Sequence, residues 1–302
     1  MSIRPVSRIV AARPTLEGAG VKLHRAFGFG NTDEFDPFLL FDDFRGDRPH
    51  DYLAGFPWHP HRGIETITYV LAGTVHHGDS LGNEGALTAG DVQWMTAGSG
   101  IIHQEMPQGD PDGRMHGFQL WANLPASLKM TTPRYQEVTA TDIPDVVDDD
   151  GTRVKIVCGS FWGKRGPVDG IATEPTYLDV SVPPGVRKTL PVETTRHAFA
   201  YVFAGSGSFR DASKPQGVLT DTTGVDIDDK PVLDLTGNRS LVLFDRGDEV
   251  TVQAGPEGIR FLLVSGRPLG EPVAWHGPIV MNTQDEIRQA LSDLRQGTFI
   301  RA

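Results

Sequence analysis

Glycine and proline interrupt this chain so often that short strands, not long helices, are favoured over most of its length. There are 35 glycines and 22 prolines in 302 residues. The segments between them are rich in β-branched and aromatic residues; residues 64–71 are one example, and Ala72 and Gly73 separate them from the next, residues 74–77. Short strands bounded by turn residues are typical of a sandwich or barrel. The sequence therefore predicts an all-β fold.

Two pairs of matching segments indicate an internal repeat. Residues 69–73 (Tyr-Val-Leu-Ala-Gly) match residues 201–205 (Tyr-Val-Phe-Ala-Gly). Residues 118–125 match residues 261–268, each beginning with phenylalanine and ending with proline. Because a repeated segment marks a repeated structural unit, the simplest interpretation is two tandem β-domains of the same kind.

The boundary between these domains is expected at an acidic linker. Residues 144–151 combine four aspartates with proline and glycine, which is typical of a solvated turn. We expect an N-terminal domain over residues 1–145 and a C-terminal domain over residues 146–302. The last part of the C-terminal domain is expected to be helical.

The helical segment lies near the C-terminus. Thr283 followed by Glu286 forms the pattern of a capping box, and Gly297 supplies the stop. Its apolar residues recur at helical spacing and would form one stripe: Ile287, Ala290, Leu291 and Leu294. We expect a short tail helix that packs this stripe onto one of the barrels.

Four polar side chains follow the alternation of extended strands. His59 and His61 are two residues apart, and so are His103 and Glu105. Side chains at positions i and i+2 lie on the same face of a strand, about 7 Å apart. A lone His-x-His near prolines is more often part of a surface loop, but the second pair lies on an apolar strand. If the two strands are neighbours, three imidazoles and a carboxylate converge, and this donor set predicts a transition-metal site.

The corresponding positions of the second half lack these ligands. Extending the repeat places Pro191 and Glu193 at the positions of the first pair, and Val252 and Ala254 at those of the second. The sequence therefore predicts one metal ion, in the N-terminal domain.

Composition argues against several classes of partner. The net charge is −11, with a pI of about 5.3, which disfavours direct binding to nucleic acid because phosphate contacts are made mainly by Lys and Arg. No apolar run approaches the roughly 18 residues that a membrane helix needs, and the first residues do not form a signal peptide. The single cysteine, Cys158, excludes an internal disulfide and fits a reducing compartment. We expect a cytoplasmic protein without a membrane partner.

The stretches around the ligands resemble the pirin family of bicupin proteins. The longest is residues 90–107, Gly-Asp-Val-Gln-Trp-Met-Thr-Ala-Gly-Ser-Gly-Ile-Ile-His-Gln-Glu-Met-Pro; the others are residues 57–66, 79–83, 117–125 and 277–283. The resemblance extends from residues 14–23 to the last helix and is looser in the C-terminal half. One departure is Asp43, since family members often carry histidine there.

This resemblance implies a fold and an iron site. The fold would be two tandem cupin domains, each a jelly-roll β-barrel, followed by the short helix. The iron ligands would be His59, His61, His103 and Glu105, in agreement with the strand pattern. Imidazole and carboxylate donors suit Fe(II), and Mn, Ni, Cu or Zn could substitute for it.

The resemblance also implies an activity. Many pirins are linked to quercetin 2,3-dioxygenase activity, in which a flavonol is opened by O2 with release of carbon monoxide. The partners would then be a small aromatic substrate and O2, and Glu105 would take the proton of the flavonol 3-hydroxyl. A different function remains open: some pirins are iron-dependent, redox-sensing regulators that bind a protein partner. A sugar-phosphate isomerase is less favoured, because only Arg62 lies close to the ligands in sequence.

Several further polar and aromatic residues have an expected place. We expect His76 and His77 to be exposed at a strand edge. Either His116 or Gln119 could hold a metal ligand, but not both, because they differ in strand parity. The tryptophans are expected in the core, although one at the mouth of a cleft would suit a flat polyphenol: Trp58, Trp94 and Trp121.

Overall fold

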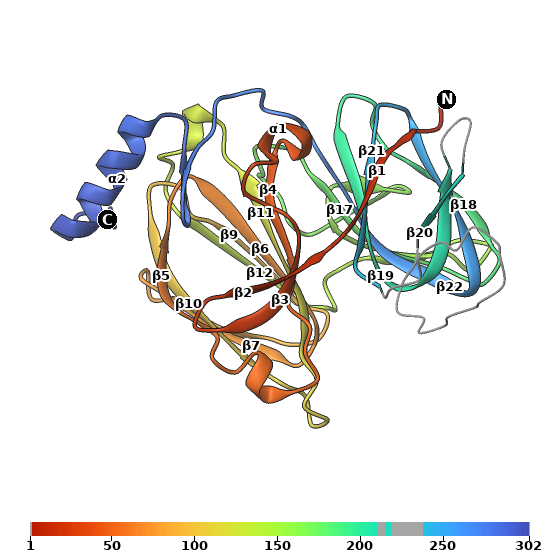
Figure 1. The fold of residues 1–302 in the computed structure, drawn as a ribbon, viewed down its shortest axis with the longest axis horizontal. Coiled ribbons are helices and arrows are strands. Elements are labelled where there is room, and N and C mark those ends of the chain that lie inside the picture. Colours follow the sequence, from red (N-terminus) through yellow and green to blue (C-terminus); the bar gives the residue numbers. More distant parts are fainter. Residues whose placement is uncertain (1, 211–214, 219–237, 302) are drawn as a thin grey trace. The chain divides into compact units, whose positions relative to one another are not determined.

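The computed structural model describes residues 2–210, 215–218 and 238–301. Within these ranges strands account for nearly all regular structure, and the one helix longer than four residues is α2 (Gln284–Gln296) (Figure 1). The predicted all-β fold with a C-terminal helix is confirmed.

The chain forms two compact units, and each takes in one end of the chain. Arg13–Asp142 and Leu269–Ala302 make up the first, called here the histidine unit; Met1–Ala12 and Ile143–Pro268 make up the second, the companion unit. The division at Ile143 lies close to the expected linker, but both chain ends belong to the unit opposite to the expected one. Strand pairing explains the N-terminal end, since β1 (Val6–Ala11) pairs with β21 (Ser240–Phe244) of the companion unit.

Two sheets build the histidine unit. The larger has the strand order β12-β9-β6-β11-β4-β3-β2, and the smaller has the order β5-β10-β7-β8. The strands of the larger sheet are β2 (Arg13–Glu17), β3 (Val21–Phe27), β4 (Phe38–Asp43), β6 (Ile64–Ala72), β9 (Val92–Thr96), β11 (His116–Asn123) and β12 (Arg134–Val138). Those of the smaller sheet are β5 (Phe56–His61), β7 (Thr74–Asp79), β8 (Glu84–Leu87) and β10 (Ile101–Gln108). Short helical turns connect them: α1 (Thr32–Phe35), η1 (Pro49–Asp51) and η2 (Ala126–Leu128).

One large sheet dominates the companion unit. Its strand order is β1-β21-β19-β22-β17-β14-β13, with β18 paired to β22 and β20 paired to β19. Its further strands are β13 (Asp145–Val147), β14 (Arg153–Cys158), β17 (Thr176–Val182), β18 (Arg187–Pro191), β19 (His197–Arg210), β20 (Pro215–Val218) and β22 (Glu249–Gly266). A small hairpin joins β15 (Ser160–Phe161) and β16 (Lys164–Arg165).

Each large sheet contains a path of seven neighbouring strands, and a comparison of the two paths supports the repeat seen in the sequence. The segments that match in sequence lie at the same places, β6 and β11 in one sheet and β19 and β22 in the other. The turn glycines of the repeat, Gly73 and Gly205, have positive φ angles of 78° and 69°. Only glycine adopts this backbone region without strain, which explains why the repeat preserves these residues.

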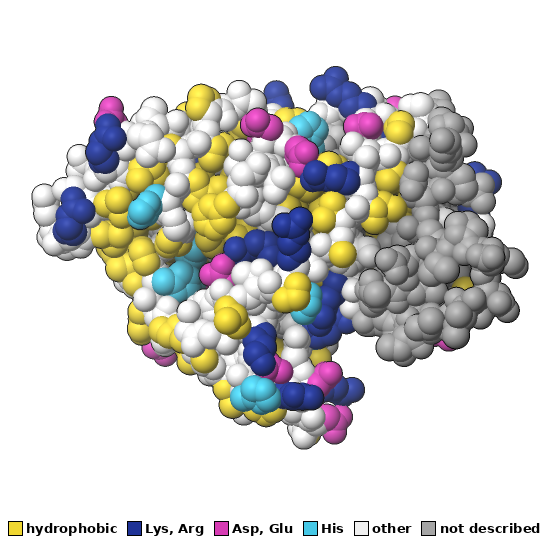
Figure 2. Space-filling view, viewed as in Figure 1, with side chains coloured by type: hydrophobic (Ala, Val, Ile, Leu, Met, Phe, Trp, Pro, Cys, Tyr) yellow, Lys and Arg dark blue, Asp and Glu magenta, His cyan; other side chains and the backbone are white. Residues whose placement is uncertain are grey.

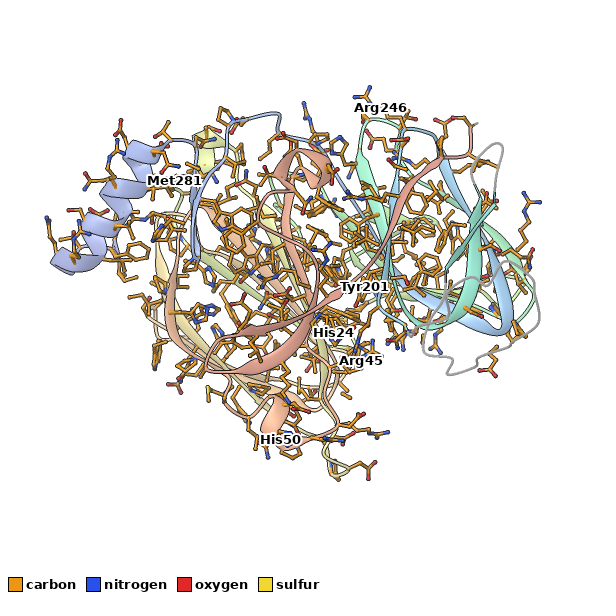
Figure 3. All side chains as sticks on the ribbon, viewed as in Figure 1. His24, Arg45, His50, Tyr201, Arg246 and Met281 are labelled. Atoms are coloured by element: carbon orange, nitrogen blue, oxygen red, sulfur yellow. The ribbon has the colours of Figure 1, made fainter. Side chains whose placement is uncertain are left out.

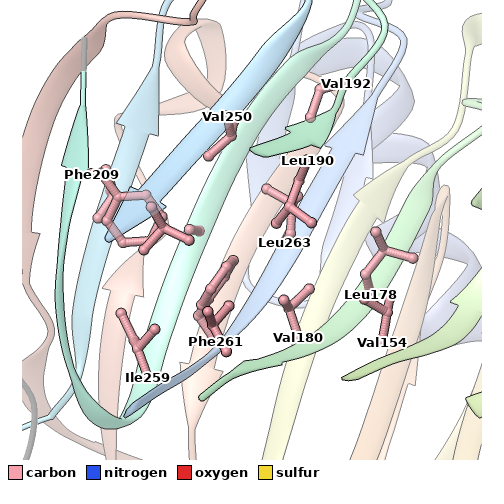
Figure 4. Packing of buried hydrophobic residues seen from close by; sticks show 14 of the residues in the cluster. Val154, Leu178, Val180, Leu190, Val192, Phe209, Val250, Ile259, Phe261 and Leu263 are labelled. Atoms are coloured by element: carbon pink, nitrogen blue, oxygen red, sulfur yellow. The ribbon is translucent and has the colours of Figure 1, made fainter. Parts of the chain in front are cut away.

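The companion unit fills its interior with apolar side chains (Figure 4). Its core cluster includes Val192, Val252 and Ala254, so apolar residues lie at or beside the positions that the repeat aligns with the metal ligands. Among the described residues, the group of three or more close potential ligands lies in the histidine unit. The prediction of one metal ion therefore applies to this group of residues.

The C-terminal tail, which includes α2, packs on the histidine unit. From its position in the sequence it would have belonged to the C-terminal domain. The capping box between Thr283 and Glu286 is present, and Gly297 ends α2 with a φ angle of 72°, as predicted. The preceding hairpin consists of β23 (Ala274–His276) and β24 (Ile279–Met281). Met281, labelled beside α2 in Figure 3, packs in one apolar cluster with Ile287 and Phe299.

No helix in the described part of the chain has the length and apolar character needed to cross a membrane. Cys158 is buried, and its Sγ lies 3.6 Å from the carbonyl oxygen of Val168.

Candidate metal centre

The two histidine-bearing strands are neighbours, as the sequence pattern requires. β5 and β10 pair in antiparallel fashion, with His59 opposite His103 and Ile101 opposite His61. A β-bulge follows, so that Glu105 lies opposite Phe56. The extra residue of the bulge lies in β5, since three steps of that strand span two steps of β10. β10 itself pairs with β7 without a shift, so His103 and Glu105 stay on one face of their strand.

Three imidazoles converge at this point. Potential ligand atoms of His59, His61 and His103 all lie within 4.8 Å of one another. The Nε2 atoms of His59 and His61 are 3.1 Å apart. Two nitrogen ligands about 2.1 Å from one ion and at right angles to each other would lie about 3 Å apart. The spacing therefore fits two ligands of one ion.

Backbone carbonyls fix the tautomers of two of these rings. The Nδ1 atom of His59 lies 2.8 Å from the carbonyl oxygen of Pro57, and that of His61 lies 3.2 Å from the carbonyl oxygen of Pro278. A carbonyl can only accept, so each Nδ1 carries the proton and each Nε2 presents a lone pair. Two lone pairs facing each other repel unless a cation lies between them.

Burial keeps the inner two rings neutral. His61 and His103 are 2% and 0% exposed. Burial lowers the pKa of both imidazoles well below the usual value, and the neighbouring histidines lower it further. Both ring nitrogens of His103 are buried without a hydrogen-bond partner, which is costly unless another group satisfies them. Neutral imidazoles with unpaired lone pairs are what a transition metal binds, so these residues fit a metal ion.

Glu105 is held in the same interior by hydrogen bonds. Its Oε1 accepts one from Thr68 Oγ1 at 2.8 Å, and both of its carboxylate oxygens lie 3.2 Å from Gln119 Nε2. The group of ligand atoms within 4.8 Å comprises the three histidines and does not include this carboxylate. Its assignment as a fourth ligand therefore remains a prediction.

A cavity of about 410 Å³ adjoins the cluster. His59, His61 and Glu105 line it, and much of the remaining wall is apolar, including Leu23 and Phe44. Figure 2 shows histidine side chains reaching the surface among hydrophobic ones near β5. The side chains of His59, His61 and Glu105, which are candidate ligands, thus border a space that a small molecule could enter.

Comparison with known proteins places the chain in a family. Residues 20–122 match the family model described as Pirin, and residues 177–300 match that of the Pirin C-terminal cupin domain. A pirin-like protein of Caulobacter vibrioides is 45% identical over 300 residues, covering 99% of this chain and all of the relative. The chain belongs to the pirin family.

Two further comparisons extend this result. Human pirin is 38% identical to the chain over 296 residues, which cover 97% of the chain and 93% of the human protein. The crystal structure of a quercetin 2,3-dioxygenase from Acinetobacter baumannii is 29% identical, with a TM-score of 0.84 and 99% of both chains covered. The expectation of two cupin-type domains is confirmed.

The structure of this pirin shows which of His116 and Gln119 contacts a candidate metal ligand. Gln119 faces Glu105, whereas His116 lies 3.5 Å from Asp43 on the other face of the sheet. The structure also adds Thr68, which is paired with Gln119 in the ladder between β6 and β11. Sequence spacing could not reveal Thr68, because the register between strands is not visible in a single strand.

Other expectations for aromatic and histidine residues are met only in part. His76 is exposed as expected, but His77 is 5% exposed, and its ring centroid lies 5.4 Å from that of His103. Trp94 is fully buried, whereas Trp58 is 55% exposed. Trp121 lines the cavity with its ring 5.1 Å from that of His61. Strand alternation explains the exposure of Trp58, because this residue is next to His59 on β5 and faces away from the interior.

Pro278 contributes to the histidine cluster, and the sequence alone did not reveal this role. Its carbonyl orients His61 across 217 residues of chain, and together with Gly277 it lines the cavity. The only signal in the sequence was the resemblance of residues 277–283 to other pirins, which did not indicate a role.

Proposed function

We propose that this pirin is an Fe(II)-dependent dioxygenase of the quercetin 2,3-dioxygenase type. Iron would be held by His59, His61, His103 and Glu105. The observation that carries the proposal is the cavity of about 410 Å³ beside the three imidazoles. A site that only senses the oxidation state of its metal needs no room for a ligand, whereas an enzyme needs space next to the metal.

The character of the cavity supports an aromatic substrate. Pockets for small molecules typically measure about 300–1,000 Å³, with mostly apolar walls and a few placed polar groups. Here Leu23, Leu40 and Phe44 supply apolar surface, and Trp121 offers an aromatic face beside His61. A flat flavonol matches such walls better than a sugar phosphate does.

Iron bound at this site would supply a binding position for the flavonol 3-hydroxyl, which it would acidify, and one-electron chemistry with O2. The three histidines would hold the ion, with His59 and His61 oriented by the carbonyls of Pro57 and Pro278. The walls would exclude bulk water from the oxygen-bearing ring.

Glu105 is the proposed acceptor of the 3-hydroxyl proton. Thr68 and Gln119 fix its carboxylate in the interior. Oε2 accepts from Gln119 Nε2, and a carboxylate oxygen has two lone pairs, so one lone pair of Oε2 could receive the proton. A Glu105→Gln protein that retains its metal and full turnover would contradict this role.

The overall reaction balances without a further reductant. Both oxygen atoms of O2 enter the ring-opened product, two carbon–carbon bonds of the central ring are broken, and one carbon leaves as carbon monoxide. The test is anaerobic reconstitution with Fe(II), followed by quercetin and O2, with flavonol absorbance and carbon monoxide measured together. Stoichiometric loss of quercetin and release of carbon monoxide are expected, and a His61→Ala protein run in parallel should show neither.

Stoichiometric iron binding without turnover would overturn the dioxygenase assignment. It would favour the alternative of an iron-dependent regulator with a protein partner. Metal analysis of the purified protein, repeated after reconstitution with Mn, Ni, Cu and Zn, tests the choice of iron.

A further inference from the structure

The cavity beside the histidines has a second polar region, formed by an ion-pair cluster. Arg25 donates two hydrogen bonds to Asp42, from Nε to Oδ1 at 2.8 Å and from Nη2 to Oδ2 at 2.7 Å. Its Nη1 lies 2.9 Å from Oε1 of Glu17. All three side chains line the cavity, whose nearby walls are apolar.

Strand register places Asp42 and Arg25 in one cross-strand row with the residues that hold Glu105. Thr68 on β6 pairs with Gln119 on β11, Gln119 pairs with Asp42 on β4, and Asp42 pairs with Arg25 on β3. Directly opposed residues share one face of a sheet, with Cα atoms about 4.5–5.5 Å apart. Asp42 therefore stands one strand away from the residue that holds Glu105. Because Asp42 lines the same cavity as His59, His61 and Glu105, one ligand in that cavity could contact both the imidazoles and Asp42.

The Asp42 carboxylate is held in place but not saturated. Arg25 occupies one acceptor site on each oxygen, and each carboxylate oxygen has two lone pairs. The side chain is only 6% exposed, and burial raises its pKa to about 6 despite the hydrogen bonds from Arg25. A carboxylate withdrawn from water benefits strongly from another donor.

The charged side chains that line the cavity determine which kind of hydrogen-bond donor Asp42 could bind. Arg25 is the only cationic side chain among the described residues that line the cavity, and it is already engaged by two carboxylates. Glu105 adds a third carboxylate. At the cluster itself two carboxylates share one guanidinium, so a further anionic group placed against Asp42 would be repelled, whereas a neutral group with an O–H donor would be stabilised.

We propose that Asp42, positioned by Arg25, is a specificity-determining residue that accepts a hydrogen bond from a phenolic hydroxyl of the substrate other than the metal-binding one. This inference rests on the proposed flavonol dioxygenase function and narrows its substrate class. The preferred substrates are polyhydroxylated flavonols, and a flavonol with only the 3-hydroxyl binds less well. The group touches the substrate at a distance from the reacting carbons and alters selection, not chemistry.

A purely structural role is the alternative. The cluster links β2, β3 and β4, so it could serve only to hold these strands together. A structural role would alter stability, or affinity for all flavonols by the same factor. A recognition role changes the ratio of affinities between flavonols that differ in their hydroxyl groups.

The test measures that ratio in the metal-loaded protein without O2. Quercetin and 3-hydroxyflavone are titrated separately under anaerobic conditions, with flavonol absorbance as the signal. The wild type should bind quercetin roughly tenfold or more tightly than 3-hydroxyflavone, the size expected for a hydrogen bond to a charged acceptor. Asp42→Asn should lose most of this preference while its affinity for 3-hydroxyflavone stays within about twofold.

Asp43→Asn is the matched control. Asp43 is the next residue on the same strand, is fully buried and forms its own ion pair with Arg45 at 2.9 Å, but it faces away from the cavity. It undergoes the same chemical change and should keep the wild-type preference. Metal content and thermal stability of each variant show whether the unit is folded.

Each outcome decides one of the two proposals. Equal preference in the wild type and Asp42→Asn overturns the recognition role while leaving the dioxygenase function standing. Equal affinity of the wild type for the two flavonols also overturns the recognition role, whether or not Asp42→Asn folds. Failure of the metal-loaded wild type to bind either flavonol overturns the proposed function itself.

Discussion

Arg62, the residue that follows β5, and Asp293 of the C-terminal helix form a buried ion pair. Arg62 Nη1 lies 2.7 Å from Asp293 Oδ2, and the two side chains are 2% and 7% exposed. Arg62 also donates to the carbonyl oxygens of Ser99 and Phe299. Because Arg62 directly follows His61, the tail is bound to the backbone that carries a proposed metal ligand.

Asp293→Asn should therefore destabilise the histidine unit. Removing one partner of a buried pair leaves the other charge uncompensated, which costs about 3–5 kcal/mol. Urea unfolding followed by tryptophan fluorescence measures this change. Asp285→Asn on the same helix is the control: its pair with Arg288 is exposed, so its effect should stay below about 1 kcal/mol. Equal effects of the two substitutions would contradict the interpretation.

Thr68→Val should weaken metal binding without unfolding the protein. The substitution keeps the shape of the side chain and removes the hydroxyl that donates to Glu105 at 2.8 Å. Loss of a group that orients a metal ligand typically costs about 10–100-fold in affinity. Competition with a chelator of known affinity gives the dissociation constant.

Thr66→Val on the same strand is the control for this prediction. The Thr66 hydroxyl is buried without a hydrogen-bond partner, so its removal should be neutral or slightly stabilising and should leave metal affinity unchanged. If Thr68→Val binds metal as tightly as Thr66→Val does, Glu105 is not held for metal binding.

Glu65 should make the stability of the protein depend on pH. The side chain is buried and accepts a hydrogen bond from Thr96 at 2.7 Å, and burial raises the pKa of its carboxyl to about 7. A raised pKa in the folded state gives a contribution that is fully present below the unfolded pKa, near 4.5, and is lost as pH rises through 7. The wild type should lose on the order of 3 kcal/mol relative to Glu65→Gln across this range.

Urea unfolding at pH 5, 6, 7 and 8 measures the difference between the two proteins. Glu84→Gln, a change at an exposed position, is the control and should run parallel to the wild type. A constant difference between wild type and Glu65→Gln at all four pH values would show that Glu65 does not titrate in this range.

Local spacing was enough to find the histidine cluster, but not its surroundings. The alternation of His59 with His61 is a property of one strand, and the glycine turns at Gly73 and Gly205 are properties of single residues. Both follow from short-range geometry, so both could be predicted. The repeat then extended these local features to two domains.

Features that depend on pairing between distant segments could not be predicted in the same way. Pro278 orients His61, and Asp293 neutralises Arg62, although each pair is separated by more than 200 residues. The match of Asp42 with Gln119 depends on a register that one strand does not encode. The placement of β1 and of the tail in opposite units has the same cause, because nothing local to these segments specifies their partners.

Gly63 follows β5 closely and lies against β24 of the tail hairpin. Its φ angle is 79°, and a Cβ atom there would collide with the carbonyl oxygen of Val280. That carbonyl also accepts a hydrogen bond from Lys129 Nζ, which bonds to the Gly63 carbonyl as well. Gly63→Ala should therefore displace the tail hairpin, lower stability by more than the backbone strain alone, and weaken metal binding through His61.

Gly82→Ala separates the backbone strain from the collision with the tail. Gly82 has a φ angle of 86°, but the space around its Cα is open. It should cost about 1–2 kcal/mol for the left-handed backbone and leave metal affinity unchanged. Gly63→Ala should cost more, and protease should cleave the tail faster in this variant than in Gly82→Ala. If the two variants lose the same stability and bind metal equally, the tail does not support the metal centre through this contact.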